Sequence, residues 1–342
     1  MPVGRPKKIN RLDYSQFSFN TQINYRLTYF SDHIEEVSHD AINRYLKNEK
    51  LAPKLIWEHA KKDVIQVESG SIVFDDTVLD KTTGKKIETS KRQYSGQSKK
   101  VVNGIGIVNC VYVHPNGEFW VIDYRIYDPS CDGKTKIDHV RDMLHSAVYS
   151  KDLLFQYVLM DTWYATHNLM LLIDDLGKIF YCPIRTNRSV TRANILNKHQ
   201  SITSIEWSEK ELKSGICLHL KGFPSGYHVG CFRIAVSSNR TDFVVTNDQT
   251  QNDSELVKDV YKLRWPIETF HREIKQLTGV QKCQCRNQRI QRTHIACSYL
   301  VWVCFKSIAK KTNTTVYKIK ENLLSDYLKQ KLRSPAYSMS FA

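Results

Sequence analysis

Four polar residues recur at helical spacing in the C-terminal half of the chain: Tyr261, Arg264, Glu268 and Lys275. An α-helix turns by about 100° per residue, so these side chains would fall within an arc of about 60°. A carboxylate can hold a divalent cation while guanidinium and ammonium groups bind phosphate oxygens on either side. The spacing therefore predicts a phosphate-handling surface suited to phosphoryl transfer on a polyanion. The alternative is an ordinary solvated charged face.

The opposite side of the same stretch is apolar, which predicts that the helix buries one face. The apolar residues are Leu263, Ile267, Phe270, Ile274 and Leu277. Glu273 lies off the polar arc, and we expect it outside the site. Pro266 lacks an N–H group and clashes with the preceding turn, so it either kinks this helix or begins it. Either outcome shifts Tyr261 and Arg264 relative to the residues that follow.

Further carboxylates follow two short apolar runs that are typical of buried strands. Residues 71–74 precede Asp75 and Asp76, and residues 156–160 precede Asp161. Open α/β sheets bind ligands at the carboxyl ends of their strands, which makes these acids candidates for a site. Adjacent residues of a continuing strand point to opposite faces, so strand geometry leaves open whether the first acid is residue 75 or 76.

Composition favours an acidic polymer as partner. The 342 residues carry 50 Lys and Arg against 35 Asp and Glu, a net charge of +15. Nucleic acid is the leading candidate, and an anionic membrane is the alternative. No uninterrupted apolar run reaches the roughly 18 residues of a membrane span. The best contender, residues 295–308, contains Ser298 and Lys306, and we interpret it as a buried helix.

The cysteines indicate a reducing compartment. Nine cysteines are scattered without pairs at a regular spacing, and no apolar leader follows Met1, so a cytoplasmic protein is expected. Cys283, Cys285 and His294 could suggest zinc, but a fourth ligand at a usual spacing is missing, which argues against that metal.

The N-terminal 65 residues are predicted to be helical. Residues 4–8 form a basic arm that could enter a minor groove or remain a solvated terminus. Ser38 could cap one helix, and Pro53 could begin a second one that runs to Lys62. Together these features predict a small DNA-binding module, with a helical extension packed on the core as the alternative.

The order of predicted elements from residue 71 to residue 185 indicates an α/β fold. The strands and helices are expected at 71–74, 104–114, 118–127, 136–148 (helix), 156–160, 166–176 (helix) and 178–185, with a hairpin turn at 115–117. This order resembles the ribonuclease-H-like core, in which the first and fourth strands lie side by side. On that resemblance, Asp75 and Asp161 would be neighbours.

Several motifs together resemble those of a known family. The spacing Y-x2-R-x3-E-x6-K, with RWPIE inside it, resembles the YREK signature of the insertion-sequence-four group of bacterial DDE transposases. Residues 160–164 (MDTWY) resemble the family's D-S/T-W-Y segment. The resemblance also includes residues 124–127, 132–136 and 187–188, and as a whole it runs from about residue 30 to about residue 305. The similarity is closest to the seven-oh-one-like branch.

The resemblance assigns roles to individual residues. It implies that Asp75, Asp161 and Glu268 are catalytic and bind metal, Asp75 being chosen because the family motif is an Asp, a variable residue and then Thr. It also implies that Tyr261, Arg264 and Lys275, with Arg272 as a weaker candidate, bind DNA phosphates. Three converging carboxylates repel unless cations neutralise them, so Mg²⁺ is the expected cofactor and Mn²⁺ its substitute.

The sequence therefore predicts a transposase that cleaves insertion-sequence ends and joins the 3′-hydroxyls to target DNA. Its partners would be double-stranded DNA and a second copy of the chain, in a nucleoid-associated complex. The alternatives are an inactive end-binding protein and a ribonuclease-H-like nuclease without strand transfer. We expect a helical DNA-binding region at residues 1–65 and a core in two parts, at residues 66–185 and 249–310. A β-rich insertion at residues 186–248 would separate the two parts, and residues 311–342 would form a tail.

Overall fold

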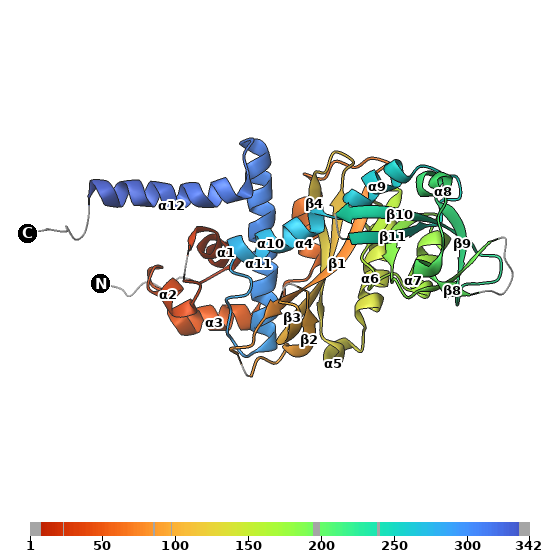
Figure 1. Ribbon diagram of the computed structural model, residues 1–342. Coiled ribbons are helices and arrows are strands. Elements are labelled where there is room, and N and C mark those ends of the chain that lie inside the picture. Colours follow the sequence, from red (N-terminus) through yellow and green to blue (C-terminus); the bar gives the residue numbers. More distant parts are fainter. Residues whose placement is uncertain are drawn as a thin grey trace, which may run out of the picture. The chain divides into compact units, whose positions relative to one another are not determined.

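The computed structural model describes residues 8–22, 24–84, 86–96, 98–193, 199–237 and 240–334 (Figure 1). Most of the basic arm at residues 4–8 lies outside these described residues. The chain divides into two compact units. The first unit comprises Met1–Asp63, Thr77–Ile107 and Thr269–Ala342, and the second comprises Val64–Asp76 and Val108–Glu268.

The second unit is a mixed α/β structure built on a large sheet. The strands of this sheet follow the order β2-β3-β1-β5-β6-β11-β10-β9-β7-β8, and β4 also pairs with β3. β2 (Lys91–Ser95), the end of β1 and the start of β3 belong to the first unit. The strands are β1 (Ser71–Asp80), β3 (Lys100–Val113), β4 (Phe119–Tyr127), β5 (Tyr157–Met160), β6 (Ile179–Ile184), β7 (Ser189–Arg192), β8 (Gln200–Ser201), β9 (Ile216–Leu220), β10 (Val229–Ser237) and β11 (Arg240–Thr246). The helices are α5 (Pro129–Asp132), α6 (Lys136–His145), α7 (His167–Asp175), α8 (Glu209–Ser214), α9 (Ser254–Lys262) and the first turn of α10 (Pro266–Leu277).

The first and fourth predicted strands lie side by side, as expected. β1 and β5 run parallel, with Phe74 opposite Met160 as the last paired residues. The next residue of each strand is an acid, Asp75 on one and Asp161 on the other, so the prediction that these two are neighbours is confirmed. We had expected this strand to end at the acids, but β1 continues past them. It continues to Asp80 because its later residues are buried alongside β3.

Local signals located several of the other elements. β3 and β4 form a hairpin at residues 114–118, where Gly117 has a φ of +89° that favours glycine. α6 begins after Thr135, whose hydroxyl accepts a hydrogen bond from the backbone N–H of Asp138 in a capping box. α7 ends just before Gly177, which has a φ of +67°.

The strand-rich segment after β6 extends the same sheet. β11 pairs antiparallel with β6, placing Val245 opposite Cys182, and β10 pairs antiparallel with β11. β9 then joins β10, and β7 joins β9. The predicted β-rich stretch is therefore hydrogen-bonded to the central strands rather than separate from them.

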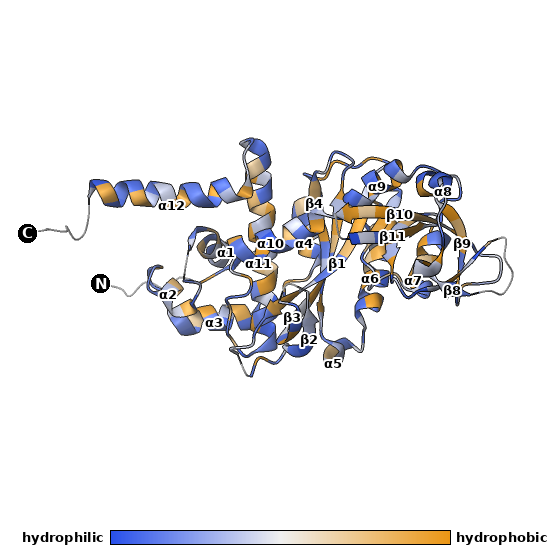
Figure 2. Ribbon diagram, in the orientation of Figure 1, coloured by the Kyte–Doolittle hydropathy of each residue, from blue (hydrophilic) through white to orange (hydrophobic). Residues whose placement is uncertain are grey.

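The first unit is mainly helical. It contains α1 (Arg11–Asn20), α2 (Leu27–Ser31), α3 (His39–Asn48), α4 (Lys54–Ala60), β2 (Lys91–Ser95), α11 (Gln288–Lys311) and α12 (Val316–Arg333). α1, α3, α4 and α12 all pack on α11, which carries hydrophobic residues along much of its length (Figure 2). The buried hydroxyl of Tyr14 lies 2.8 Å from Nδ1 of His294 and links α1 to α11.

The structure of this unit tests two predictions made from the sequence. No strand was predicted between residues 74 and 104, but this stretch contains β2, in which Lys91 pairs with Gly104 of β3. β2 is mostly polar, so no hydrophobic pattern marked it. The interpretation of residues 295–308 as a buried helix is confirmed by α11. Across the described ranges, no helix is long and apolar enough to cross a membrane.

Candidate active site

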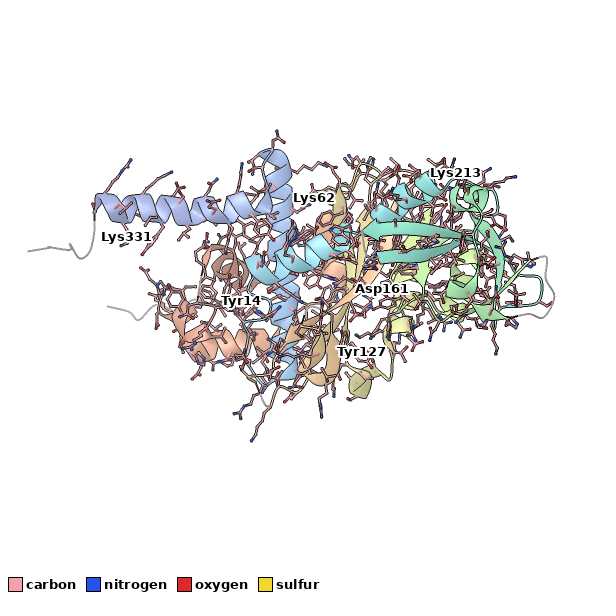
Figure 3. All side chains as sticks on the ribbon, in the orientation of Figure 1. Tyr14, Lys62, Tyr127, Asp161, Lys213 and Lys331 are labelled. Atoms are coloured by element: carbon pink, nitrogen blue, oxygen red, sulfur yellow. The ribbon has the colours of Figure 1, made fainter. Side chains whose placement is uncertain are left out.

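The site in the second unit is built around two acids on neighbouring strands. Asp75 and Asp161 each follow the last paired residue of β1 and β5, and adjacent strands lie about 4.8 Å apart. Burial raises the pKa of Asp75 well above its ordinary value, and the nearby carboxylates of Asp161 and Asp76 raise it further. Burial also raises the pKa of Asp161, which is labelled in Figure 3. The pair therefore favours a nearby positive charge.

Backbone N–H groups orient both carboxylates. The N–H of Asp76 donates to Oδ1 of Asp75 at 2.8 Å. The N–H of Trp163 donates to Oδ1 of Asp161 at 2.6 Å. These hydrogen bonds oppose the rise in pKa, because they favour the charged form of each acid.

Asp76, the other candidate for the first acid, has different surroundings. Its Oδ2 accepts from Nζ of Lys136 at 2.5 Å, and its Oδ1 accepts from the hydroxyl of Tyr164 at 2.8 Å. Both carboxylate oxygens of Asp76 therefore make hydrogen bonds within the unit.

The predicted continuous helix from Tyr261 to Lys275 is interrupted. α9 ends at Lys262 and α10 begins at Pro266. The backbone N–H of Arg264 donates to the carbonyl of Tyr261 in the intervening turn. Pro266 begins a helix here because the first helical position needs no N–H donor. The single narrow arc expected from 100° spacing is thus replaced by two helix segments.

Arg264 lies next to the acids. Its Nη2 is 3.0 Å from Oε1 of Glu268, and its side chain is only 11% exposed. Burial alone would lower its pKa, but the neighbouring Tyr261, Glu268 and Asp75 raise it. The guanidinium is therefore a fixed positive charge in the electrostatic range of all three predicted catalytic acids, Asp75, Asp161 and Glu268.

Tyr261 is buried, and its hydroxyl is already hydrogen-bonded. It donates to Oδ2 of Asp242 at 2.9 Å. Arg240 donates two further hydrogen bonds to the same carboxylate, each of 2.9 Å. Burial raises the pKa of Tyr261, and so does Asp242. Within the second unit, Tyr261 thus anchors the end of α9 to β11, and its predicted phosphate contact stays a prediction.

The remaining predicted DNA contacts, Arg272 and Lys275, belong to the part of α10 that lies in the first unit. Arg272 is exposed and Lys275 is half-buried. Their phosphate contacts stay predictions. Glu273 is buried, and its Oε2 accepts a hydrogen bond of 3.0 Å from Nε1 of Trp302. Glu273 therefore contributes to helix packing in that unit.

The acids have the right chemistry for a hard divalent cation. Carboxylate oxygens are the ligands that Mg²⁺ prefers, and Asp75 and Asp161 are adjacent with raised pKa values that a cation would reverse. In the part of the chain that the structure describes, no group of three or more His, Cys, Asp or Glu side chains is arranged to hold an ion. Glu268 is paired with Arg264 instead.

The sequence analysis did not predict three residues that the structure places around the site. Lys136 and Tyr164 contact Asp76, and Asp242 binds Tyr261. Lys136 lies in the 132–136 segment and Tyr164 in the 160–164 segment, both of which carry the family resemblance. Those two motifs were the signal that could have located them. Asp242 had no such signal.

Comparison with known proteins identifies the family. Residues 69–304 match the sequence profile described as the transposase DDE domain. A comparison with curated proteins gives no match. Among solved structures, a piggyBac transposase synaptic complex with hairpin DNA is similar, with 10% identity, a TM-score of 0.49 and coverage of 98% of this chain and 76% of that chain.

A pre-cleavage Mos1 transpososome is similar at 11% identity and a TM-score of 0.17, with coverage of 90% of this chain and 81% of that chain. At these scores neither structural similarity supports a conclusion about this chain. The profile match is different, because it spans most of the chain and includes both neighbouring acids and Glu268. This chain belongs to the transposase DDE domain family.

Proposed function

We propose that this protein is a metal-dependent transposase of the insertion-sequence-four group with the YREK signature. It cleaves the ends of its insertion sequence and joins the freed 3′-hydroxyls to target DNA. The observation that carries the proposal is the pairing of Asp75 with Asp161 at the end of the parallel β1–β5 ladder, within a DDE domain. We also propose that this part of the sheet is a ribonuclease-H-like core, supported by its strand order.

In the proposed mechanism, Asp75, Asp161 and Glu268 supply the metal-binding oxygens. Bound Mg²⁺ would supply Lewis-acid activation of the attacking water or 3′-hydroxyl and stabilisation of the leaving oxygen. Asp75 and Asp161 are already adjacent, whereas Glu268 is paired with Arg264. We propose that Glu268 exchanges its pairing with Arg264 for the metal, which would leave the guanidinium available for a phosphate oxygen.

DNA binding would use the positive charge of the chain. The net charge of +15 supports an electrostatic contribution to binding. We propose that Arg264, Tyr261, Lys275 and Arg272 act at the transposon end, and that the N-terminal helices α1 to α4 contribute further contacts. Two DNA ends must be handled together, so we propose a homodimer in the DNA complex.

A cleavage assay tests the proposal. The purified protein is incubated with Mg²⁺ and linear DNA that carries the ends of its own element, and the products are separated on a denaturing gel. Asp75→Ala, Asp161→Ala and Glu268→Ala should each abolish cleavage and leave DNA binding measurable, because each removes a metal ligand. Asp175 is an exposed acid at the end of α7. The Asp175→Ala variant is therefore the matched control, and it should cleave DNA as the wild type does.

The products separate this function from its rivals. Cleaved ends joined to target DNA support a transposase, whereas cleaved ends that are never joined indicate a nuclease without strand transfer. Binding without any cleavage in Mg²⁺ or Mn²⁺ would indicate an end-binding protein and overturn the proposal.

A further inference from the structure

We propose that Asp76, Lys136 and Tyr164 are positioning residues, a clamp that holds Asp75 and Asp161 side by side before any metal ion binds. The clamp rests on the proposed function only in taking Asp75 and Asp161 as the metal ligands. It assigns Asp76 a positioning role, which is distinct from the proposed metal-binding role of Asp75.

The clamp begins where the backbone pairing of the two strands stops. The β1–β5 ladder ends with Phe74 opposite Met160, so no further pair of that ladder holds the two acids together. Tyr164 follows Asp161 by three residues, and its buried hydroxyl donates to Asp76 at 2.8 Å. This hydrogen bond connects the segment after β5 to β1 just beyond the last paired residues.

Lys136 completes the clamp from a third element. It is the first residue of α6, and the capping box of Thr135 and Asp138 defines where that helix begins. Nζ of Lys136 lies 2.5 Å from Oδ2 of Asp76, and its side chain is 13% exposed. A helix start therefore delivers a largely buried ammonium group to the carboxylate.

Two aromatic rings surround the same ammonium group. Nζ of Lys136 lies 5.5 Å from the ring centroid of Tyr127 and 5.7 Å from that of Trp163. Ring faces attract cations at such distances, so both rings favour this location for the charge. Trp163 lies between Asp161 and Tyr164 in sequence, which brings a second residue of that segment onto Lys136.

The charges explain why a clamp is useful here. Asp75, Asp76 and Asp161 place three carboxylates close together, and any of them could take a metal ion. Lys136 and Tyr164 each donate a hydrogen bond to one oxygen of Asp76, so the charge of Asp76 is offset within the clamp, and Asp75 and Asp161 are the proposed metal ligands. Without Lys136, Asp76 would repel its neighbours and compete for the ion at the wrong position.

The test measures binding of Mn²⁺ to the full chain without DNA, from the loss of the free Mn²⁺ signal in electron paramagnetic resonance. Lys136→Met and Tyr164→Phe should each weaken Mn²⁺ binding by about 10- to 100-fold, as expected for residues that orient metal ligands. Lys136→Arg should recover part of the affinity, because it restores the positive charge. Asp75→Asn should abolish binding, whereas Asp76→Asn should only weaken it.

Lys134→Met is the matched control. Lys134 lies two residues earlier and pairs with Asp142 at 2.5 Å, but its side chain is 45% exposed. This variant should bind Mn²⁺ as the wild type does. Melting curves in EDTA establish that each variant is folded, and Tyr164→Phe, which loses only a hydroxyl, carries the test if Lys136→Met does not fold.

Three results would overturn the clamp. The first is an affinity for Mn²⁺ in both Lys136→Met and Tyr164→Phe that equals that of the wild type. The second is loss of Mn²⁺ binding in Asp76→Asn while Asp75→Asn still binds the ion. A wild type that binds no Mn²⁺ without DNA would also refute it, because the site would not be assembled in advance. A protein that binds Mn²⁺ through Asp75 but never cuts DNA would refute the transposase and leave the clamp intact.

Discussion

Asp75→Asn should stabilise the metal-free protein at neutral and alkaline pH. Asparagine keeps the shape of the side chain and its oxygen acceptor for the N–H of Asp76, but it removes the negative charge. Asp75 and Asp161 follow directly opposed residues on adjacent strands, so their repulsion is lost with that charge. The same substitution removes a proposed metal ligand, so stabilisation by Mg²⁺ should be lost with it.

The size of the effect follows from the strand spacing. Two unit charges about 5 Å apart repel by about 3 kcal/mol at an effective dielectric constant of about 20. This is an upper bound, because the positive charge of Arg264 offsets part of the repulsion. A free-energy difference of 1 kcal/mol shifts the melting temperature of a domain of 150–250 residues by about 2–4 °C. The expected rise is therefore several degrees.

The sign of the pH dependence follows from the raised pKa values. Folding raises the pKa of Asp75 and Asp161, so the folded protein binds protons more tightly than the unfolded chain. The resulting stabilisation is fully present below the ordinary aspartate pKa of about 4 and is lost as the pH rises through the raised values. In EDTA, the wild type should therefore lose stability as the pH rises above the ordinary aspartate range and through the raised pKa values, and Asp75→Asn should lose less.

Melting curves in EDTA and in Mg²⁺, recorded at several pH values, measure both effects. Mg²⁺ at 100 times its dissociation constant should stabilise the wild type by about 2.7 kcal/mol and leave Asp75→Asn unchanged. Asp175→Asn removes an equal charge from an exposed position and serves as control. If Asp75→Asn melts no higher than the wild type in EDTA at pH 8, or no higher than this control, the repulsion argument is refuted.

Three further predictions concern other parts of the site. Tyr261→Phe should lower the free energy of unfolding by about 1 kcal/mol, because the half-buried carboxylate of Asp242 loses a hydrogen bond; an unchanged urea midpoint would show that this contact contributes nothing. Lys275→Ala should reduce the slope of log affinity against log salt by roughly one, and an unchanged slope in a salt titration would remove Lys275 from the phosphate-binding set. Mg²⁺ and Mn²⁺ should support cleavage, whereas Ca²⁺ should permit DNA binding with little chemistry. Cleavage that persists in EDTA or requires Zn²⁺ would contradict the proposed mechanism.

Local sequence patterns were sufficient to locate the strands that carry the acids. The apolar runs before Asp75 and Asp161 form the parallel pair of strands β1 and β5. Gly117 lies in the hairpin turn, Thr135 begins α6, and Gly177 follows α7. These features are readable because each depends on residues close together in the chain, through hydrophobic periodicity, capping or a positive φ angle.

The same reasoning failed where local patterns were weak or allowed two outcomes. β2 is a polar strand that exists because it pairs with β3, so its own residues gave no signal. Pro266 allowed either a kink or a helix start, and the folded chain has the start, with α9 ending at Lys262. In each case a tertiary contact or a turn decided between conformations that the sequence alone permits.

The partners of Asp76 could be found only in the folded protein. Asp76 and Asp75 are adjacent acids on one strand, and strand geometry cannot rank them. Lys136 lies 60 residues after Asp76, and Tyr164 lies 88 residues after it. Contacts at such separations depend on how α6 and the segment after β5 pack against β1, and no short-range pattern records that packing. The sequence by itself determined which residue types could bind a metal, whereas the tertiary structure decided which of the two adjacent acids is held by a lysine and a tyrosine.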